Sequence, residues 1–214
     1  MSIISDAFFN SILNLTGLND FSNEKLNAKN IVVLKMLINY IENNGQYIYS
    51  SWYPILNILS HINIYKRCTG HLVVGLNKNR NLDLSGFVQN FVNNTNQLSA
   101  ITIDSIDKIY LKTKEFNFDV LKRFIIELIK ISEEEIQLFN TEKNKKNKER
   151  FFSFDKLVCV IDINKERLKN EEGSEIYTLV NDFFVKLISN NPLDDILLNK
   201  VKENVKIIDK DIKK

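Results

Sequence analysis

The sequence predicts an all-α fold of the armadillo or HEAT type, a solenoid of stacked helical hairpins. The chain has 214 residues, 44% of them hydrophobic, which is enough for a substantial core. It contains only 6 Gly and 2 Pro, although sheets with many tight turns need both. Apolar residues recur at spacings of three and four over most of the chain. We therefore expect about nine or ten helices that pair in sequence as one helical-repeat domain over residues 1–214.

The first two helices are expected in the first 45 residues. Ser5 is a good N-cap for a short helix with Phe8, Ile12 and Leu15 on one face, ended at Thr16-Gly17. The second is expected from about residue 27 to residue 43 and stops at Asn44-Gly45. Its predicted core face comprises Ile31, Leu34, Ile38 and Ile41, widened by Val32 and Leu37.

A third helix is expected after Ser51, which can serve as its N-cap. Pro54 would fall in the first turn, where a missing N–H costs little. The predicted core side chains of this helix are Trp52, Ile55, Leu56, Leu59 and Ile62. The following stretch, residues 66–100, shows no clear period apart from a short helix expected around Leu84 to Val92.

Helical periodicity returns in the C-terminal half of the chain. Helices are expected over residues 103–110 and after an Asn117 cap, and Ser132 with Glu135 has the pattern of a capping box that opens a brief further helix. Later helices are expected after a Ser153 cap, from Ser174 after a polar stretch over residues 164–173, and from about Leu193. Residues 141–150 contain no apolar side chain and predict an exposed loop.

Charge and cysteine content exclude several classes of function. The net charge is only +2, so no broad positive field indicates nucleic-acid binding. Two cysteines, Cys68 and Cys159, fit a reducing compartment. No apolar run reaches the roughly 20 residues that span a bilayer, and the N-terminus lacks a signal-peptide pattern. We expect a cytoplasmic protein, or part of a larger one.

The sequence contains no recognisable catalytic, cofactor or metal motif. No glycine-rich phosphate loop occurs. Cys68 with His61 and His71 could be imagined as a metal or thiolate site, but a structural zinc normally needs four ligands, so a buried Cys and a surface His are the simpler interpretation. Acidic clusters at residues 133–135, 171–172 and 194–195 are expected at helix N-termini, where they complement the helix dipole. An enzyme with a diffuse site remains an alternative.

Two local features suggest a contact with a partner. The first is a basic run beside Phe151 and Phe152 that could touch anionic lipid or an acidic partner, with a solvated loop as the competing interpretation. This run comprises Lys143, Lys145, Lys146, Lys148 and Arg150. The second is an aromatic cluster that fits either a partner hot spot or, by preference, core packing at a hairpin corner. Its members are Tyr47, Tyr49, Trp52 and Tyr53.

Read in order, these landmarks resemble one family, the large brefeldin-A-inhibited Golgi guanine-nucleotide exchange factors for Arf GTPases. The most specific stretch is Asn44-Gly45-Gln46-Tyr47-Ile48 followed by Ser51-Trp52, which is similar to the family's Asp-Gly-Asn-Tyr-Leu and Ser-Trp pattern. Asp6-Ala7-Phe8-Phe9 resembles the opening of the same region, and Arg150-Phe151-Phe152-Ser153 resembles a later Arg-Met-Phe-Ser element. The tryptophans that the family has after Ser174 are absent. Within these motifs we expect structural roles for Asn44, Gly45, Tyr47, Ser51, Trp52 and Ser153.

The resemblance is to the helical region downstream of the exchange-catalysing domain of those proteins. It implies a fragment of a much longer chain, with no catalytic residue of its own. It also implies a regulatory or recruitment role in Golgi vesicle traffic, in which the domain senses GTP-loaded Arf or membrane and relieves autoinhibition. Expected partners are an Arf-family GTPase, other domains of the parent protein and the anionic Golgi or trans-Golgi membrane, without a cofactor. The alternative is a stand-alone helical-repeat adaptor for protein partners.

Overall fold

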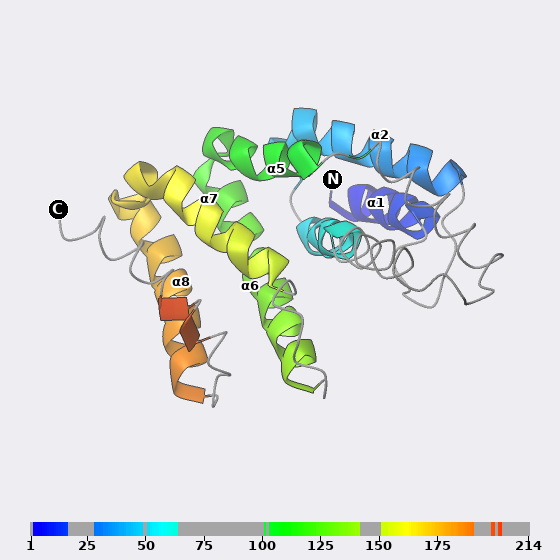
Figure 1. The fold of residues 1–214 in the computed structure, drawn as a ribbon. Helices are drawn as coiled ribbons and strands as arrows, with labels where there is room; N and C mark the ends of the chain where they lie inside the picture. The colour runs from blue at the N-terminus through cyan, green and yellow to red at the C-terminus, as the bar shows by residue number, and fades with distance from the viewer. Residues whose placement is uncertain are drawn as a thin grey trace, which may run out of the picture. The chain divides into compact units, whose positions relative to one another are not determined.

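The computed structural model describes residues 2–16, 28–48, 51–63, 101, 103–141, 151–190, 198–199 and 201–202. Within these ranges every regular element is helical and no strand occurs. The chain divides into two compact units, Met1–Ile109 and Tyr110–Lys214 (Figure 1). The prediction of an all-helical protein is therefore confirmed for the described part of the chain.

The N-terminal unit contains α1 (Ser2–Thr16), α2 (Ala28–Asn44), the short 3-10 helix η1 (Gly45–Tyr47) and a further helix that includes residues 52–63. The predicted core face of α2 is confirmed for five residues that are all buried, Ile31, Leu34, Leu37, Ile38 and Ile41. The expectation that Val32 widens this face is wrong, because Val32 is 55% exposed. The predicted face of the helix over residues 52–63 is confirmed too. Its buried side chains include Trp52, Ile55, Leu56, Leu59 and Ile62.

The predicted start and apolar face of α1 are wrong. The helix begins at Ser2, three residues before the predicted Ser5 cap. Its buried side chains are Phe9, Leu13 and Thr16, whereas Phe8 and Leu15 are exposed. Both sets have helical spacing, so periodicity alone could not choose between them. Packing decided it, since α1 lies against α2 with the Asn30 Nδ2 donating to the carbonyl of Leu15 at 2.7 Å.

The C-terminal unit is built mainly from α6 (Phe118–Thr141), α7 (Phe152–Leu168) and α8 (Glu171–Asn190). They follow α5 (Ile103–Leu111), which crosses from one unit into the other, and the 3-10 helix η2 (Lys112–Glu115). The predicted Asn117 cap is confirmed, because its Oδ1 accepts the backbone N–H of Val120 at 2.9 Å. The aromatic core includes Tyr110, whose ring meets those of Phe124 and Phe152 edge to face.

Helix α6 runs unbroken through the residues predicted to open a new helix. The Ser132 hydroxyl donates to the carbonyl of Leu128 at 2.7 Å, one turn back in the same helix, so Ser132 caps nothing. The acidic run over residues 133–135 accordingly lies in the C-terminal half of α6 and not at a helix N-terminus. The capping-box prediction is wrong because such a tetrapeptide also fits a helix interior when its apolar neighbours continue the period.

The predicted polar stretch over residues 164–173 is wrong too. Helix α7 continues to Leu168 and α8 begins at Glu171, so two residues separate them. Gly173 permits this short connection, because a Cβ at that position would lie 2.4 Å from the Cα of Leu168 and 2.7 Å from the carbonyl oxygen of Arg167. Glycine there lets the first turn of α8 approach the end of α7 closely.

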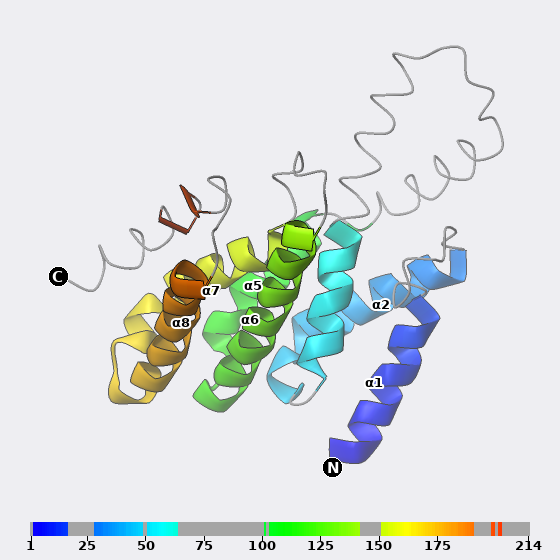
Figure 2. The same cartoon turned by 90° about the horizontal axis from the view of Figure 1, so that it is seen from below.

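Helices α6 and α8 run in the same direction (Figure 2). Two ion pairs join them, Lys122 with Glu175 near their N-termini and Lys186 with Glu133 (2.7 Å) further along. Each pair links residues 53 positions apart in the sequence. Helices α6 and α8 therefore lie side by side in parallel register, with α7 antiparallel between them in the sequence.

Candidate functional site

The predicted basic contact lies outside the described residues. Lys143, Lys145, Lys146, Lys148 and Arg150 all belong to residues 142–150, which separate the described end of α6 from Phe151. The structure does describe both flanks of this segment. The geometry of α6 and α7 at those flanks therefore decides whether the neighbouring aromatic side chains can take part in a membrane or partner contact.

The two phenylalanines beside the basic run are core residues. Phe151 is fully buried and Phe152 almost so. The Phe152 ring packs 6.0 Å from that of Tyr110, and the Lys156 ammonium lies 5.5 Å from the Phe152 centroid, a cation–π arrangement. These two buried rings cannot themselves enter a membrane. Any contact made by the basic run therefore depends on its charges.

A buried carboxylate on α6 binds the first turn of α7, directly after the basic segment. Glu135, on α6 and 6% exposed, accepts the backbone N–H of Ser153 at 2.9 Å and its hydroxyl at 2.6 Å. Ser153 is the second residue of α7 and is not its N-cap, so the capping prediction is wrong. The carboxylate itself satisfies an N–H that the first turn leaves free and complements the helix dipole. This cross-helix cap holds the first turn of α7 against α6.

The motif residues between α2 and the next helix form a structural corner. The Asn44 side chain donates to the carbonyl of Tyr40 at 3.1 Å, and the buried Gly45 accepts the N–H of Ile48 at 3.0 Å. Ser51 and Trp52 are buried, in keeping with the expected structural roles. Tyr47 is the exception, since 63% of its surface is exposed. Tyr49 lies outside the described residues.

A polar network that the sequence did not suggest anchors η2 to α7. Asn164, buried on α7, donates to the Thr113 hydroxyl at 3.0 Å. The Arg167 guanidinium donates to the carbonyl of Lys114 at 2.7 Å and to that of Phe116, and it stacks 4.9 Å from the Phe118 ring centroid. Asn164 and Arg167 are one turn apart, the single sequence feature that could have linked them. All of these contacts join α7 to η2 and the residues that follow it, so we assign the network a structural role.

The described residues contain no group of His, Cys, Asp and Glu that could hold a metal ion. Cys68 and His71 lie outside them, so the imagined Cys/His site stays untested.

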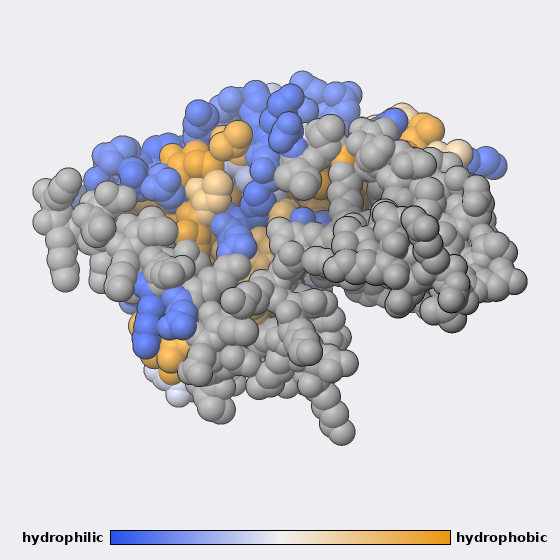
Figure 3. Space-filling view, in the orientation of Figure 1, coloured by the Kyte–Doolittle hydropathy of each residue, from blue (hydrophilic) through white to orange (hydrophobic). Residues whose placement is uncertain are grey.

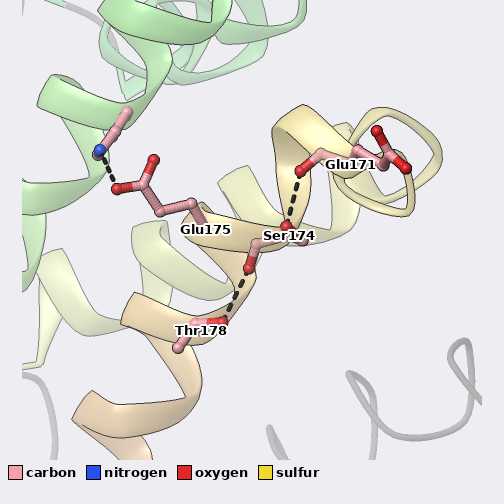
Figure 4. A network of polar contacts seen from close by, with 5 residues as sticks. Glu171, Ser174, Glu175 and Thr178 are labelled. Atoms are coloured by element: carbon pink, nitrogen blue, oxygen red, sulfur yellow. Dashed lines mark hydrogen bonds and ion pairs between the residues drawn. The ribbon is translucent and has the colours of Figure 1, made fainter.

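Glu171 and Glu172 occupy the first turn of α8, as predicted for a helix N-terminus. In the first two turns of this helix the Ser174 hydroxyl donates to the carbonyl of Glu171, and the Thr178 hydroxyl donates to that of Ser174 (Figure 4). Glu175 forms its ion pair with Lys122 from the same part of α8.

An exposed apolar surface on the N-terminal unit was missed at the level of the sequence. Five large hydrophobic side chains of α1 and α2 are exposed between 43% and 67%. They are Phe8, Leu15, Val32, Met36 and Tyr40, and we call them the α1–α2 apolar surface. Figure 3 shows hydrophobic side chains among hydrophilic ones over α2. Among the described helices none has the length and hydropathy of a membrane span.

These features define an all-helical framework with one open apolar surface and no described catalytic cluster. No family model matches the chain. A relative that it resembles is the ADP-ribosylation factor guanine nucleotide-exchange factor sec72 of Schizosaccharomyces pombe, 24% identical over 217 residues. The match covers 86% of this chain and 11% of that protein. The chain thus spans about a tenth of its relative's length. The similarity indicates a distant relation to Arf exchange factors.

Proposed function

We propose that this chain is a non-catalytic regulatory or recruitment segment of an Arf guanine-nucleotide exchange factor. The observation that supports the proposal is the match to sec72 along 86% of the chain, in a protein named for Arf exchange. An all-helical fold suits a regulatory segment, which needs surfaces and not a reaction centre. The parallel register of α6 and α8, with its offset of 53 residues, favours the solenoid arrangement of armadillo or HEAT type.

In this proposal the domain switches the parent protein between an inhibited and an active arrangement. GTP-loaded Arf or the Golgi membrane would bind the active arrangement more tightly, and only that difference in affinity can shift the population. Other domains of the parent chain would be the partners in the inhibited state. The protein would then be cytoplasmic and peripheral at Golgi or trans-Golgi membranes. The exchange reaction itself would belong to the rest of the parent chain.

A stand-alone adaptor is the second candidate, and the α1–α2 apolar surface favours it. Exposed aromatic and methionine side chains are typical of protein interfaces and need no GTPase to explain them. The two proposals differ in one prediction. An adaptor binds its partner equally whether Arf carries GTP or GDP, whereas a regulatory segment of an Arf exchange factor distinguishes the two nucleotides.

Co-sedimentation with liposomes separates these proposals. The purified chain is mixed with anionic liposomes that carry Arf loaded with GTP or with GDP, at low and at physiological salt. We expect the chain to sediment with GTP-loaded Arf and to stay in the supernatant with GDP-loaded Arf. Equal binding in both nucleotide states, or no binding, would contradict the sensing role and leave the adaptor.

The same assay tests the basic segment. Replacing Lys143, Lys145, Lys146 and Lys148 by Gln removes about four favourable contacts with anionic lipid, each worth about 1 kcal/mol. We expect weaker binding to anionic liposomes without Arf and no change with neutral liposomes. Glutamine replacements at the partly exposed Lys165, in α7, and Lys169, directly after α7, are the control for loss of lysine charge elsewhere on the chain. If the lysine variant binds anionic liposomes as the wild type does, the basic run is not a membrane contact.

A further inference from the structure

We propose that the α1–α2 apolar surface docks an amphipathic α-helix of a partner protein, with acidic side chains at the end that meets the start of α2. This inference goes beyond the proposed function, because it names a surface and a ligand chemistry and requires neither Arf nor membrane. It rests on the exposed side chains of α2, their continuity with α1 and the charges beside them.

Helix α2 has two apolar faces of different kinds. One is its core face, and the other is a narrow stripe at which Val32, Met36 and Tyr40 repeat every four residues, so that they lie above one another on the helix. Met36 is 67% exposed and Val32 is 55% exposed. A stripe with this spacing matches the ridge that one helix offers to the groove of another.

Aromatic contacts link the stripe to α1. The Tyr40 ring meets that of Phe9 with centroids 5.7 Å apart, and Phe9 meets Phe8 at 5.9 Å. Phe9 is itself buried, whereas Phe8 is 57% exposed. The stripe on α2 therefore lies beside α1, and Phe8 adds an exposed aromatic ring on that neighbouring helix.

The charges around the stripe are complementary to an acidic ligand. Lys29 precedes Val32 by one turn and Lys35 adjoins Met36, and both are exposed. Neither forms an ion pair with a described residue. Glu42, the single acidic residue of α2, lies in its last turn and is half-buried. A partner with acidic side chains near the start of α2 gains two favourable pairs and meets no acidic residue in the first three turns of this helix.

A protein helix fits this surface better than a membrane does. Two lysines supply only about 2 kcal/mol toward anionic lipid, too little for stable attachment. Methionine and tyrosine are enriched at protein interfaces, where methionine adapts to irregular partners. The neighbouring polar residues on this face, Asn39 and Asn43, are exposed amides that suit an interface rim rather than a lipid phase.

The test uses two synthetic peptides of about 20 residues, long enough to be helical when stapled. Both have a leucine stripe, and they differ only in having Glu or Lys beside it at one end. Fluorescence anisotropy with the full chain measures binding at low and physiological salt. We expect the Glu peptide to bind about tenfold more tightly than the Lys peptide, with the difference reduced by salt.

Three variants assign the binding to residues. Val32→Gln with Met36→Gln should weaken the Glu peptide about tenfold or more, because the apolar contact is lost while glutamine preserves the helix. Val185→Gln with Ile188→Gln, at the exposed residues of α8, is the matched control and should change nothing. Lys29→Glu with Lys35→Glu should reverse the preference, so that the Lys peptide binds more tightly.

Several outcomes would overturn the proposal. No binding of either peptide would do so, as would equal losses in the α2 and α8 variants. If the Val32→Gln, Met36→Gln variant loses binding to anionic liposomes while peptide binding is unchanged, the surface is a membrane contact. If the same substitutions instead abolish a dimer seen by sedimentation velocity, its occupant is a second copy of the chain.

Discussion

The two units of the chain use their surfaces differently. In the C-terminal unit α6, α7 and α8 hold 19 charged residues in 61, and ion pairs or buried polar networks join them to one another. In the N-terminal unit α1 and α2 hold 4 charged residues in 32, while five of their large hydrophobic side chains are exposed. The comparison indicates that the C-terminal unit is a framework of helices joined by polar contacts, whereas the N-terminal unit offers a surface for recognition.

Among the substitutions considered, we expect Gly173→Ala to lower the stability of the framework most. A Cβ there would meet backbone atoms of α7 that cannot move alone, so α8 must shift as a body. We expect a loss of about 3 kcal/mol in the free energy of unfolding, measured by urea denaturation with circular dichroism. Ser174→Ala, at the exposed neighbouring residue, should cost less than about 0.5 kcal/mol. If the two variants unfold at the same urea concentration, α7 and α8 do not approach each other at Gly173 as closely as described.

A smaller loss is expected from removing the cap between α6 and α7. Glu135→Ala leaves the buried N–H and hydroxyl of Ser153 without this acceptor, which costs about 2 kcal/mol for bonds to a charged group. Glu134→Ala, at the exposed preceding residue, is the control and should change the free energy of unfolding little. Hydrogen exchange should also speed up in the first turn of α7. Unchanged exchange there would mean that Glu135 does not cap this helix.

A third and smaller loss of stability is expected from weakening the contacts of Arg167 with η2 and the residue after it. Arg167→Lys retains the charge but loses the planar fork that reaches the carbonyls of Lys114 and Phe116. We expect it to destabilise the chain by about 1 kcal/mol, nearly as much as Arg167→Ala. Thermal unfolding of both variants beside the wild type measures this. Full stability of the lysine variant would show that charge, and not geometry, is what matters at this residue.

The smallest effect on stability is expected in the N-terminal unit. Val32→Gln with Met36→Gln replaces exposed side chains on a helix, so the free energy of unfolding should change by less than about 0.5 kcal/mol. The difference from the framework variants is the point of this experiment, because here we expect a loss of binding without a loss of stability. A large destabilisation in urea would mean that these side chains support the core of the N-terminal unit.

Much of the fold could be predicted because most helices have one strongly apolar face. Residues 31–41 and 52–62 show this, since their spacing identified most of the buried side chains, with Val32 as the exception that is exposed. The prediction did not succeed where two helical stripes compete, as in α1, or where a capping pattern sits inside a longer helix, as at Ser132. In both cases the choice depends on a neighbouring helix that local spacing does not reveal.

The candidate surfaces were predicted less well than the fold. The basic run was visible in the sequence because its five residues lie within residues 143–150. Phe8, Met36 and Tyr40, in contrast, look like ordinary helix residues until packing shows which apolar side chains stay exposed. The contact between Glu135 and Ser153 joins residues 18 positions apart, and that between Asn164 and Thr113 joins residues 51 apart. Such polar partners depend on tertiary placement, which no short motif encodes.

Binding of the Glu peptide by matched variants tests the division between recognition and framework most directly. We predict that the wild type and the Val185→Gln, Ile188→Gln variant of α8 bind this peptide with the same affinity. The Val32→Gln, Met36→Gln variant should bind it about tenfold less tightly while it stays fully folded. Peptide binding that is lost through the α8 substitutions and kept through the α2 substitutions would contradict the division.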